Sequence, residues 1–231
     1  CQPAARRVSR ADMGPFFYIL LGVGVATLVG VVISRVNQRA RARKQAREAV
    51  VGGANVTNDI TRVGVGGVLR LPPFGRSAAP IETYVEHRHR YDEEGEAPWY
   101  ELICVHGKRE LLIEWERRAA ALHVTGGFED ENPSLSDLGL SEQDMIALDE
   151  GERTSFRWDG VEWRLAESGE RRYYEDDGQR AEGYYGWDFQ APGGDRFVSI
   201  EKWADEPDFD VYHLWRIDAS AVEIYDAGKS R

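Results

Sequence analysis

The sequence lacks the residue patterns by which most enzyme classes are recognised. It has only two cysteines, Cys1 and Cys104, which are too few for a disulfide scaffold or a four-thiolate zinc site. No Ser or Cys stands in a nucleophile elbow, and no phosphate-binding or dinucleotide-binding glycine motif is present. We therefore predict a protein that is not an enzyme and that uses no cofactor.

The charge of the chain is divided unevenly along its length. The formal net charge is −11, but residues 1–50 carry nine basic and two acidic residues, a net of +7, which leaves −18 for residues 51–231. A basic terminus on an acidic protein is typical of a membrane or nucleic-acid contact. Because phosphate contacts need clustered Lys and Arg, the acidic remainder argues against a nucleic-acid partner.

A long apolar run follows the basic N-terminus. From Pro15 to Ser34 the chain reads PFFYILLGVGVATLVGVVIS, without one charged residue. About 20 residues of helix are needed to cross the hydrocarbon core of a bilayer, so 15–34 is predicted to be a transmembrane helix. The alternative is a buried helix of a soluble fold.

The charges on the two sides of this run predict its orientation. Six basic residues follow Ser34, whereas three Arg and one Asp precede the run. Positive charge is retained in the cytoplasm, which predicts a single-pass protein of the bacterial inner membrane. Residues 1–14 are then extracytoplasmic, and the C-terminal domain is cytoplasmic.

The first residue is a cysteine. A chain that begins with Cys1 resembles a mature bacterial lipoprotein, in which this residue carries the lipid, so Cys1 is a candidate for lipidation. The alternative is that translation begins at Met13.

Two further patterns surround the predicted span. Small residues at Gly22, Ala26 and Gly30 would lie on one helix face and let a partner helix approach, although glycine is common in membrane helices. Residues 35–56 are predicted to be a basic juxtamembrane helix and linker. Four arginines step along it and would contact lipid headgroups, or act only as stop-transfer charges: Arg35, Arg39, Arg43 and Arg47. The predicted partners are the lipid bilayer and an integral membrane protein complex.

Beyond the linker, two stretches have similar landmarks, which predicts an internal duplication. The pairs Ile113-Glu114 and Ile200-Glu201 lie 87 positions apart, and the segments 59–66 and 144–151 share an Asp-to-Gly pattern at an offset of 85. The predicted units are 57–140, which includes a connecting loop, and 141–231. Chance similarity between β-rich segments is the alternative.

The fold class predicted for the whole chain is mainly β, with the N-terminal transmembrane helix followed by an antiparallel domain of two similar repeats, sandwich-like or barrel-like. Short runs rich in Val, Ile, Tyr and Trp predict the strands, and Trp158-Asp159-Gly160-Val161 predicts a tight hairpin. Ser141 and Asp144 have the spacing of a helix capping box. Residues 119–122 are predicted to form a short helix.

Two groups of residues are candidates for chemistry, whereas the cysteine of the β domain is not. His87 and His89 alternate on one predicted strand and, with His106 or Glu101, could ligate a metal; a polar strand face is the alternative. Glu114 and Glu201 occupy matching positions and could form a carboxylate pair, or be structural. Cys104, between Ile103 and Val105, is expected to be a buried, inert thiol.

Several segments resemble a bacterial family known as the domain of unknown function 4178. The similarity covers roughly residues 57–226 and is carried by five segments: NDITRVGVGGVLRL, WYELICVHGKRELLIEWE, VEWRLAESGERRYY, GYYGWDFQAPGGDRFVSIEKW and DVYHLWRI. The resemblance implies a β-rich fold and brings no catalytic residues. The apolar run at 15–34 is not part of that pattern.

Together these features favour a non-catalytic, membrane-anchored accessory or scaffolding subunit of a larger inner-membrane complex. Two other functions remain open. The acidic domain could be a cytoplasmic ligand-sensing module that binds a small cationic molecule such as a polyamine. His87 and His89 could instead belong to a metal-dependent hydrolase.

Overall fold

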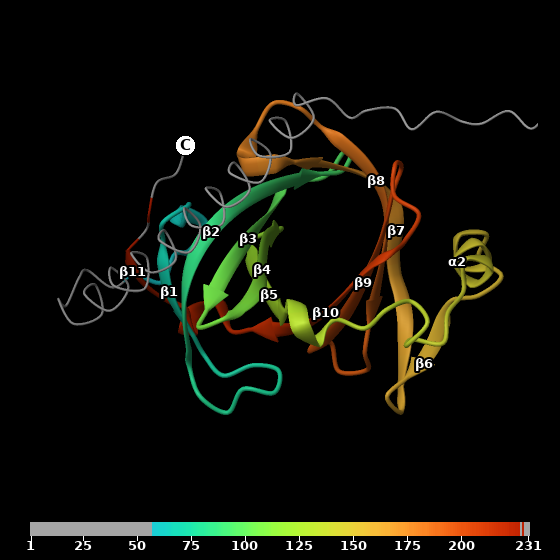
Figure 1. The fold of residues 1–231 in the computed structure, drawn as a ribbon, viewed down its shortest axis with the longest axis horizontal. Helices are drawn as coiled ribbons and strands as arrows, with labels where there is room; N and C mark the ends of the chain where they lie inside the picture. The colour runs from blue at the N-terminus through green and yellow to red at the C-terminus, as the bar shows by residue number, and fades with distance from the viewer. Residues whose placement is uncertain (1–56, 227, 229–231) are drawn as a thin grey trace, which may run out of the picture. The chain divides into compact units, whose positions relative to one another are not determined.

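Antiparallel β-strands make up most of the described chain, which comprises residues 57–226 and Gly228 of a computed structural model (Figure 1). The strand segments alternate apolar and polar residues, a pattern that suits a pleated sheet with one apolar face. Two four-stranded meanders form the larger part of the sheet. They are β2 (Ile81–Asp92), β3 (Trp99–His106), β4 (Arg109–Arg118) and β5 (Ala121–Phe128), and β7 (Val161–Tyr174), β8 (Glu182–Gln190), β9 (Arg196–Trp203) and β10 (Asp210–Ile217).

These eight strands close into a barrel. β5 pairs with β10, and the end of β2 at Arg90–Asp92 pairs with β7 at Arg172–Tyr174. A β-bulge interrupts β2 between Val85 and His87, and another interrupts β7 between Leu165 and Glu167. Bulges bend a strand and increase its twist, which brings the two ends of the sheet together.

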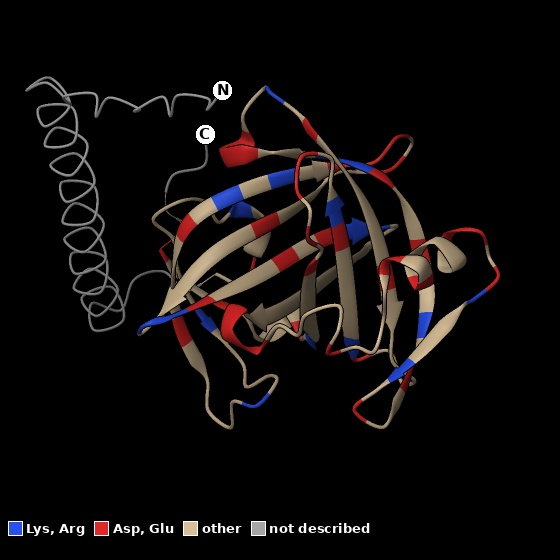
Figure 2. Cartoon of the chain, turned by 45° about the vertical axis from the view of Figure 1, so that its right-hand side comes forward, with Lys and Arg blue, Asp and Glu red and all other residues tan. Residues whose placement is uncertain are grey.

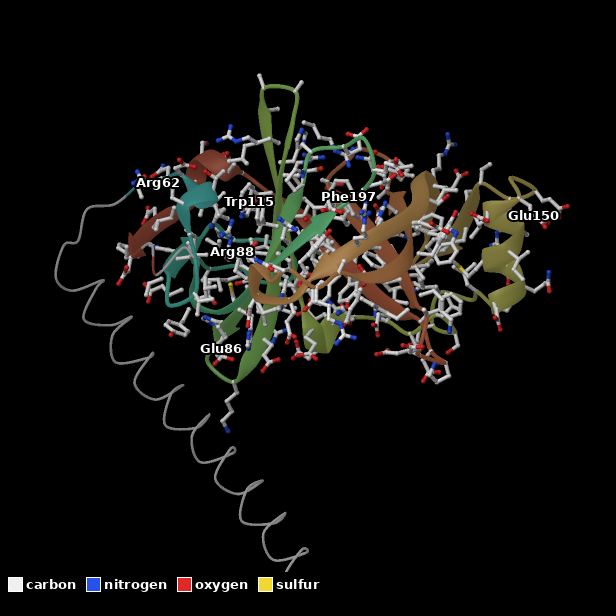
Figure 3. All side chains as sticks on the ribbon, turned by 90° about the horizontal axis from the view of Figure 1, so that it is seen from above. Arg62, Glu86, Arg88, Trp115, Glu150 and Phe197 are labelled. Atoms are coloured by element: carbon white, nitrogen blue, oxygen red, sulfur yellow. The ribbon has the colours of Figure 1, made fainter. Side chains whose placement is uncertain are left out.

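Smaller elements cover the outside of the barrel on two opposite sides (Figure 1). On one side β1 (Val68–Leu71) pairs with β2 and with β11 (Glu223–Asp226). On the other side β6 (Ser155–Trp158) pairs with β7, next to the helix α2 (Glu142–Asp149). In Figure 3 the labelled Arg62 and Glu150 mark these two ends of the molecule. The short 3-10 turns are η1 (Ile60–Arg62), η2 (Glu129–Glu131), η3 (Glu175–Asp177) and η4 (Ala219–Ala221).

The apolar core lies on the outer face of the barrel wall and is divided into two clusters. Under β1, β11 and η1, buried residues such as Leu102 and Ile113 form the first cluster. Under α2 and β6, buried residues such as Trp187 and Ile200 form the second. Burial of each large apolar side chain contributes roughly 1.5–3 kcal/mol. The alternate residues of the same strands face the barrel interior, and many of them are polar.

The seam between β5 and β10 depends on a close backbone approach at Gly127. A Cβ at this position would collide with the carbonyl oxygen of His213 and lie 3.0 Å from Cδ2 of Leu214. We therefore expect Gly127→Ala to lower the free energy of unfolding by about 1–3 kcal/mol in urea denaturation. Gly183→Ala on β8 is the matched control, because no atom lies within 4 Å of its Cβ position. Equal effects of the two substitutions would contradict this account of the seam.

The predicted fold class is wrong for the described residues. They form a mainly β, antiparallel fold with a closed eight-stranded barrel, and their single α-helix, α2, has eight residues. At about 1.5 Å per residue α2 is far shorter than a bilayer core, and no helix between residues 57 and 226 is long and apolar enough to cross a membrane. The predicted span at 15–34 itself lies outside the described residues.

Local predictions had mixed outcomes. The Asp-Gly hairpin is confirmed: Trp158 pairs with Val161, and Asp159 and Gly160 both have positive φ. The capping box is also confirmed, since Ser141 and Asp144 exchange hydrogen bonds at the start of α2. The short helix predicted at 119–122 is wrong, because β4 continues through a tight turn at Ala119 (φ 54°) into β5.

Candidate functional site: an acidic cavity inside the barrel

A cavity of about 690 Å³ lies inside the barrel and is lined from seven of its eight strands. This volume is in the range of small-molecule binding sites. Seven carboxylate residues line the cavity against four arginines, and Figure 2 shows the acidic positions in red along the strands. The carboxylate residues are Glu93, Glu96, Glu114, Glu116, Glu167, Asp188 and Glu201, and the arginines are Arg117, Arg118, Arg171 and Arg216.

Three glutamates on inward-facing strand positions are the central feature of the site, and we call them the interior glutamates. They are Glu101 on β3, Glu114 on β4 and Glu201 on β9. Glu101 and Glu114 are directly opposite each other in the register of β3 and β4, which is unfavourable for two like charges. Glu101 is only 6% exposed and Glu201 only 7%. Among the described residues, no Lys, Arg or His forms a salt bridge with any of the three.

Burial and mutual repulsion favour the neutral forms of these carboxyls. Desolvation, reinforced by the charge of Glu114, raises the pKa of Glu101 to about 8. Desolvation and the nearby Asp188 raise the pKa of Glu114 to about 7. The pKa of Glu201 is raised well above its ordinary value by desolvation and then by Glu101 and Glu114. Perturbed carboxyls gathered at a cavity are typical of functional sites.

The hydrogen bonding of the interior glutamates is incomplete. Thr125 on β5 donates a hydrogen bond of 3.2 Å to Oε2 of Glu114. Oε2 of Glu201 is buried and has no hydrogen-bond partner within the part of the chain that the structure describes. A buried acceptor without a donor is costly, and this one belongs to a residue that lines the cavity.

Arg171 on β7 is the buried cation of the cavity wall, and other carboxylates already engage it. Its Nη2 donates a hydrogen bond of 2.7 Å to Asp188, and its Nε one of 3.3 Å to Glu93. Asp188 also accepts a hydrogen bond of 2.7 Å from Ser199. Gly186 makes room for this arrangement, since a Cβ there would lie 2.5 Å from Nη1 of Arg171. The charge of Arg171 is therefore balanced by Asp188 and Glu93.

Aromatic side chains form the wall next to the interior glutamates. Tyr91 is stacked against Trp99 with ring centroids 5.4 Å apart, and its edge meets Tyr184 at 5.9 Å. Tyr184 in turn is stacked on Trp203 at 4.7 Å. Trp99 and Tyr184 line the cavity itself. Aromatic faces attract cations, and this attraction adds to that of nearby carboxylates.

The histidines proposed as metal ligands are occupied by other contacts. His87 and His89 project together, with parallel rings 5.8 Å apart, but Nδ1 of His87 lies 3.1 Å from Asp176 and Nδ1 of His89 accepts from the backbone of Asp176. His106 donates instead to the carbonyl of Glu82. Within residues 57–226, no group of three His, Cys, Asp or Glu side chains is placed to hold a metal ion.

Cys104 lies at the opposite side of the barrel wall from the cavity. It is fully buried in the first apolar cluster, and desolvation raises the pKa of its thiol above the ordinary value. A neutral thiol in such surroundings is a packing group rather than a nucleophile.

The site residues predicted from the N-terminal sequence lie outside the described residues. They are Cys1, Gly22, Ala26, Gly30, Arg35, Arg39, Arg43 and Arg47. Of the residues predicted in the β domain, Glu114 and Glu201 do face the same interior. Sequence reasoning did not connect Glu101, Arg171 and Asp188 with them. The sequence pattern that could have indicated inward-facing carboxylates is the alternation of acidic with apolar residues along β3, β4 and β8.

The fold and the cavity define an eight-stranded antiparallel barrel with a polar, acidic interior. Residues 81–219 match the family described as Domain of unknown function (DUF4178), and the chain belongs to that family. The match begins with β2 and ends in η4, so it includes all eight barrel strands. No curated protein and no solved structure matches the chain.

Proposed function

We propose that this protein binds a small organic cation inside its barrel and acts as a receptor rather than as a catalyst. The observation that carries the proposal is the set of interior glutamates: Glu114 and Glu201 line the cavity, Glu101 is opposite Glu114, and among the described residues no cationic side chain forms a salt bridge with any of them. A cationic ligand would supply the missing countercharge.

The side chains on the cavity wall indicate which class of organic cation would bind. Oε2 of Glu201 needs a hydrogen-bond donor, which a protonated amine provides and a quaternary ammonium does not. Trp99 and Tyr184 offer aromatic surface to the methylene groups next to such an amine. The cavity of about 690 Å³ is large enough for a linear diamine or polyamine.

The accessory-subunit hypothesis depends on features of residues 1–50, which lie outside the described residues. The barrel interior neither supports nor opposes it. Receptor activity within the barrel is the function for which the described residues supply a site.

Isothermal titration calorimetry on the full chain at pH 8 tests the proposal. We expect 1,4-diaminobutane to bind and the uncharged 1,4-butanediol not to bind. Glu201→Gln should weaken diamine binding about 10- to 100-fold, because one charge-assisted hydrogen bond is lost.

The matched control is Glu162→Gln on β7, whose side chain is 50% exposed and does not line the cavity. This substitution should leave the affinity unchanged. Absence of binding heat with 1,4-diaminobutane and longer polyamines would refute the proposed function.

A further inference from the structure

In the ligand-free barrel the interior glutamates would repel one another if all were ionised, and protonation removes this repulsion. Glu101 and Glu114 are opposite each other, and Glu201 is nine-tenths buried with one unpartnered oxygen. Three ionised carboxylates in such a place repel one another strongly, and the nearby Arg171 already forms ion pairs with Asp188 and Glu93. Protons and a cationic ligand are therefore alternative ways to neutralise the same set.

We infer that the cavity exchanges protons for its ligand: a cationic amine binds by displacing protons held among Glu101, Glu114 and Glu201, and acidification expels it. This inference rests on the proposed function and adds to it how uptake and release are controlled. The exchange needs no other co-reactant, because the protons leave to solvent as the ammonium enters.

Five other ionisable side chains that face the interior do not change charge near neutral pH. On β2, burial lowers the pKa of His89 to about 4 and raises that of Tyr91. Burial likewise raises the pKa of Tyr173, Tyr184 and Tyr212 on β7, β8 and β10.

The remaining charged groups around the set include the pair of Arg171 and Asp188, Glu93 beside Arg171, Asp210 opposite Glu201, and Glu116, which pairs with Arg118. His123 on β5 also lines the cavity, where its Nδ1 accepts a hydrogen bond from Arg216. A variant of His123 is therefore needed to distinguish its contribution to the proton release from that of the glutamates.

The direction of the pH dependence follows from linkage. The pKa values of Glu101 and Glu114, about 8 and about 7, mean that these carboxyls still hold protons at neutral pH in the empty barrel. A bound ammonium favours their ionised forms, so binding releases protons and affinity rises with pH. Each proton exchanged corresponds to about a tenfold change in affinity per pH unit.

The test is calorimetric titration of the full chain with 1,4-diaminobutane at pH 6, 7 and 8, and at pH 7.5 in phosphate and again in Tris. The probe keeps its charge throughout, since alkyl ammonium groups titrate near pH 10. We expect the heat to differ between the buffers in proportion to about one proton released per ligand near pH 7.5. We also expect Kd to fall about tenfold from pH 6 to pH 7.

Two variants identify the source of the protons. Glu101→Gln should reduce the proton release while binding persists, because Glu101 is the cross-strand partner of Glu114 but does not itself line the cavity. His123→Asn should leave the release unchanged. Binding with equal heats in both buffers and a constant Kd would overturn the exchange and leave the proposed function intact. Binding at no pH would refute the proposed function itself, and the exchange with it.

Discussion

Replacing Arg171 by methionine is expected to lower the free energy of unfolding by about 3 kcal/mol at pH 7. Methionine retains much of the buried volume but removes the hydrogen bonds to Asp188 and Glu93. Asp188 then adds an unbalanced charge to a cavity that already holds Glu114 and Glu201. Urea denaturation followed by tryptophan fluorescence measures the loss.

A double-mutant cycle shows whether the loss comes from charge. Asp188→Asn in the Arg171→Met background should recover part of the stability, because it removes the charge left without a partner. Arg164→Met on the same strand is the control, since its side chain is 71% exposed and we expect little change. A loss below about 1 kcal/mol for Arg171→Met would show that the ion pair is not a structural requirement.

Replacing Glu101 by glutamine is expected to have the opposite effect and to stabilise the ligand-free protein at pH 8 by on the order of 3 kcal/mol. The pKa of Glu101 is about 8 in the folded chain, against an ordinary value of 4.5. Its contribution to stability is therefore fully present below pH 4.5 and is lost as the pH rises toward 8. Glutamine is similar in size and cannot ionise, so it removes this loss.

The pH at which the two proteins are compared decides the outcome. The difference in unfolding free energy between Glu101→Gln and the unchanged protein should be near zero at pH 4.5 and grow continuously to pH 8. Glu162→Gln, at an exposed position, should show no such trend. A difference that stays constant with pH would mean that Glu101 does not hold a proton in the folded barrel.

Together, these two substitutions test how the charges of the interior are compensated. Arg171 forms ion pairs with Asp188 and Glu93, whereas burial favours the protonated forms of Glu101, Glu114 and Glu201. The barrel can carry such an interior because its apolar clusters lie outside the wall and are covered by β1, β11, β6 and α2. The apolar clusters and the proposed binding cavity thus lie on opposite faces of the same strands.

Much of the strand pattern could be predicted from local sequence. Runs rich in Val, Ile, Tyr and Trp located most of the strands. The Asp159-Gly160 turn and the Ser141–Asp144 capping box were also predictable, since each depends on only a few neighbouring residues. β5 was missed because its sequence, ALHVTGGF, contains two adjacent glycines and lacks a strand's alternation. The reason for a glycine appears only in the tertiary structure, where Gly127 packs closely against the backbone of His213 on β10.

The candidate site was harder to predict, because its residues come together only in the tertiary structure. Matching positions associated Glu114 with Glu201, but nothing local indicates that Asp188 and Arg171 share their cavity or that Glu101 is opposite Glu114. The acidic composition alone suggested a cationic ligand as one possibility.

The sequence by itself determined the β-rich character, the family resemblance and the two different faces of each strand, because composition and period-two alternation are local properties. Only the tertiary structure decided which face became the interior. That choice depends on the pairing of β2 with β7 and of β5 with β10, between residues some eighty or more positions apart. Closure through these pairs turned the polar face inward and collected its carboxylates around one cavity.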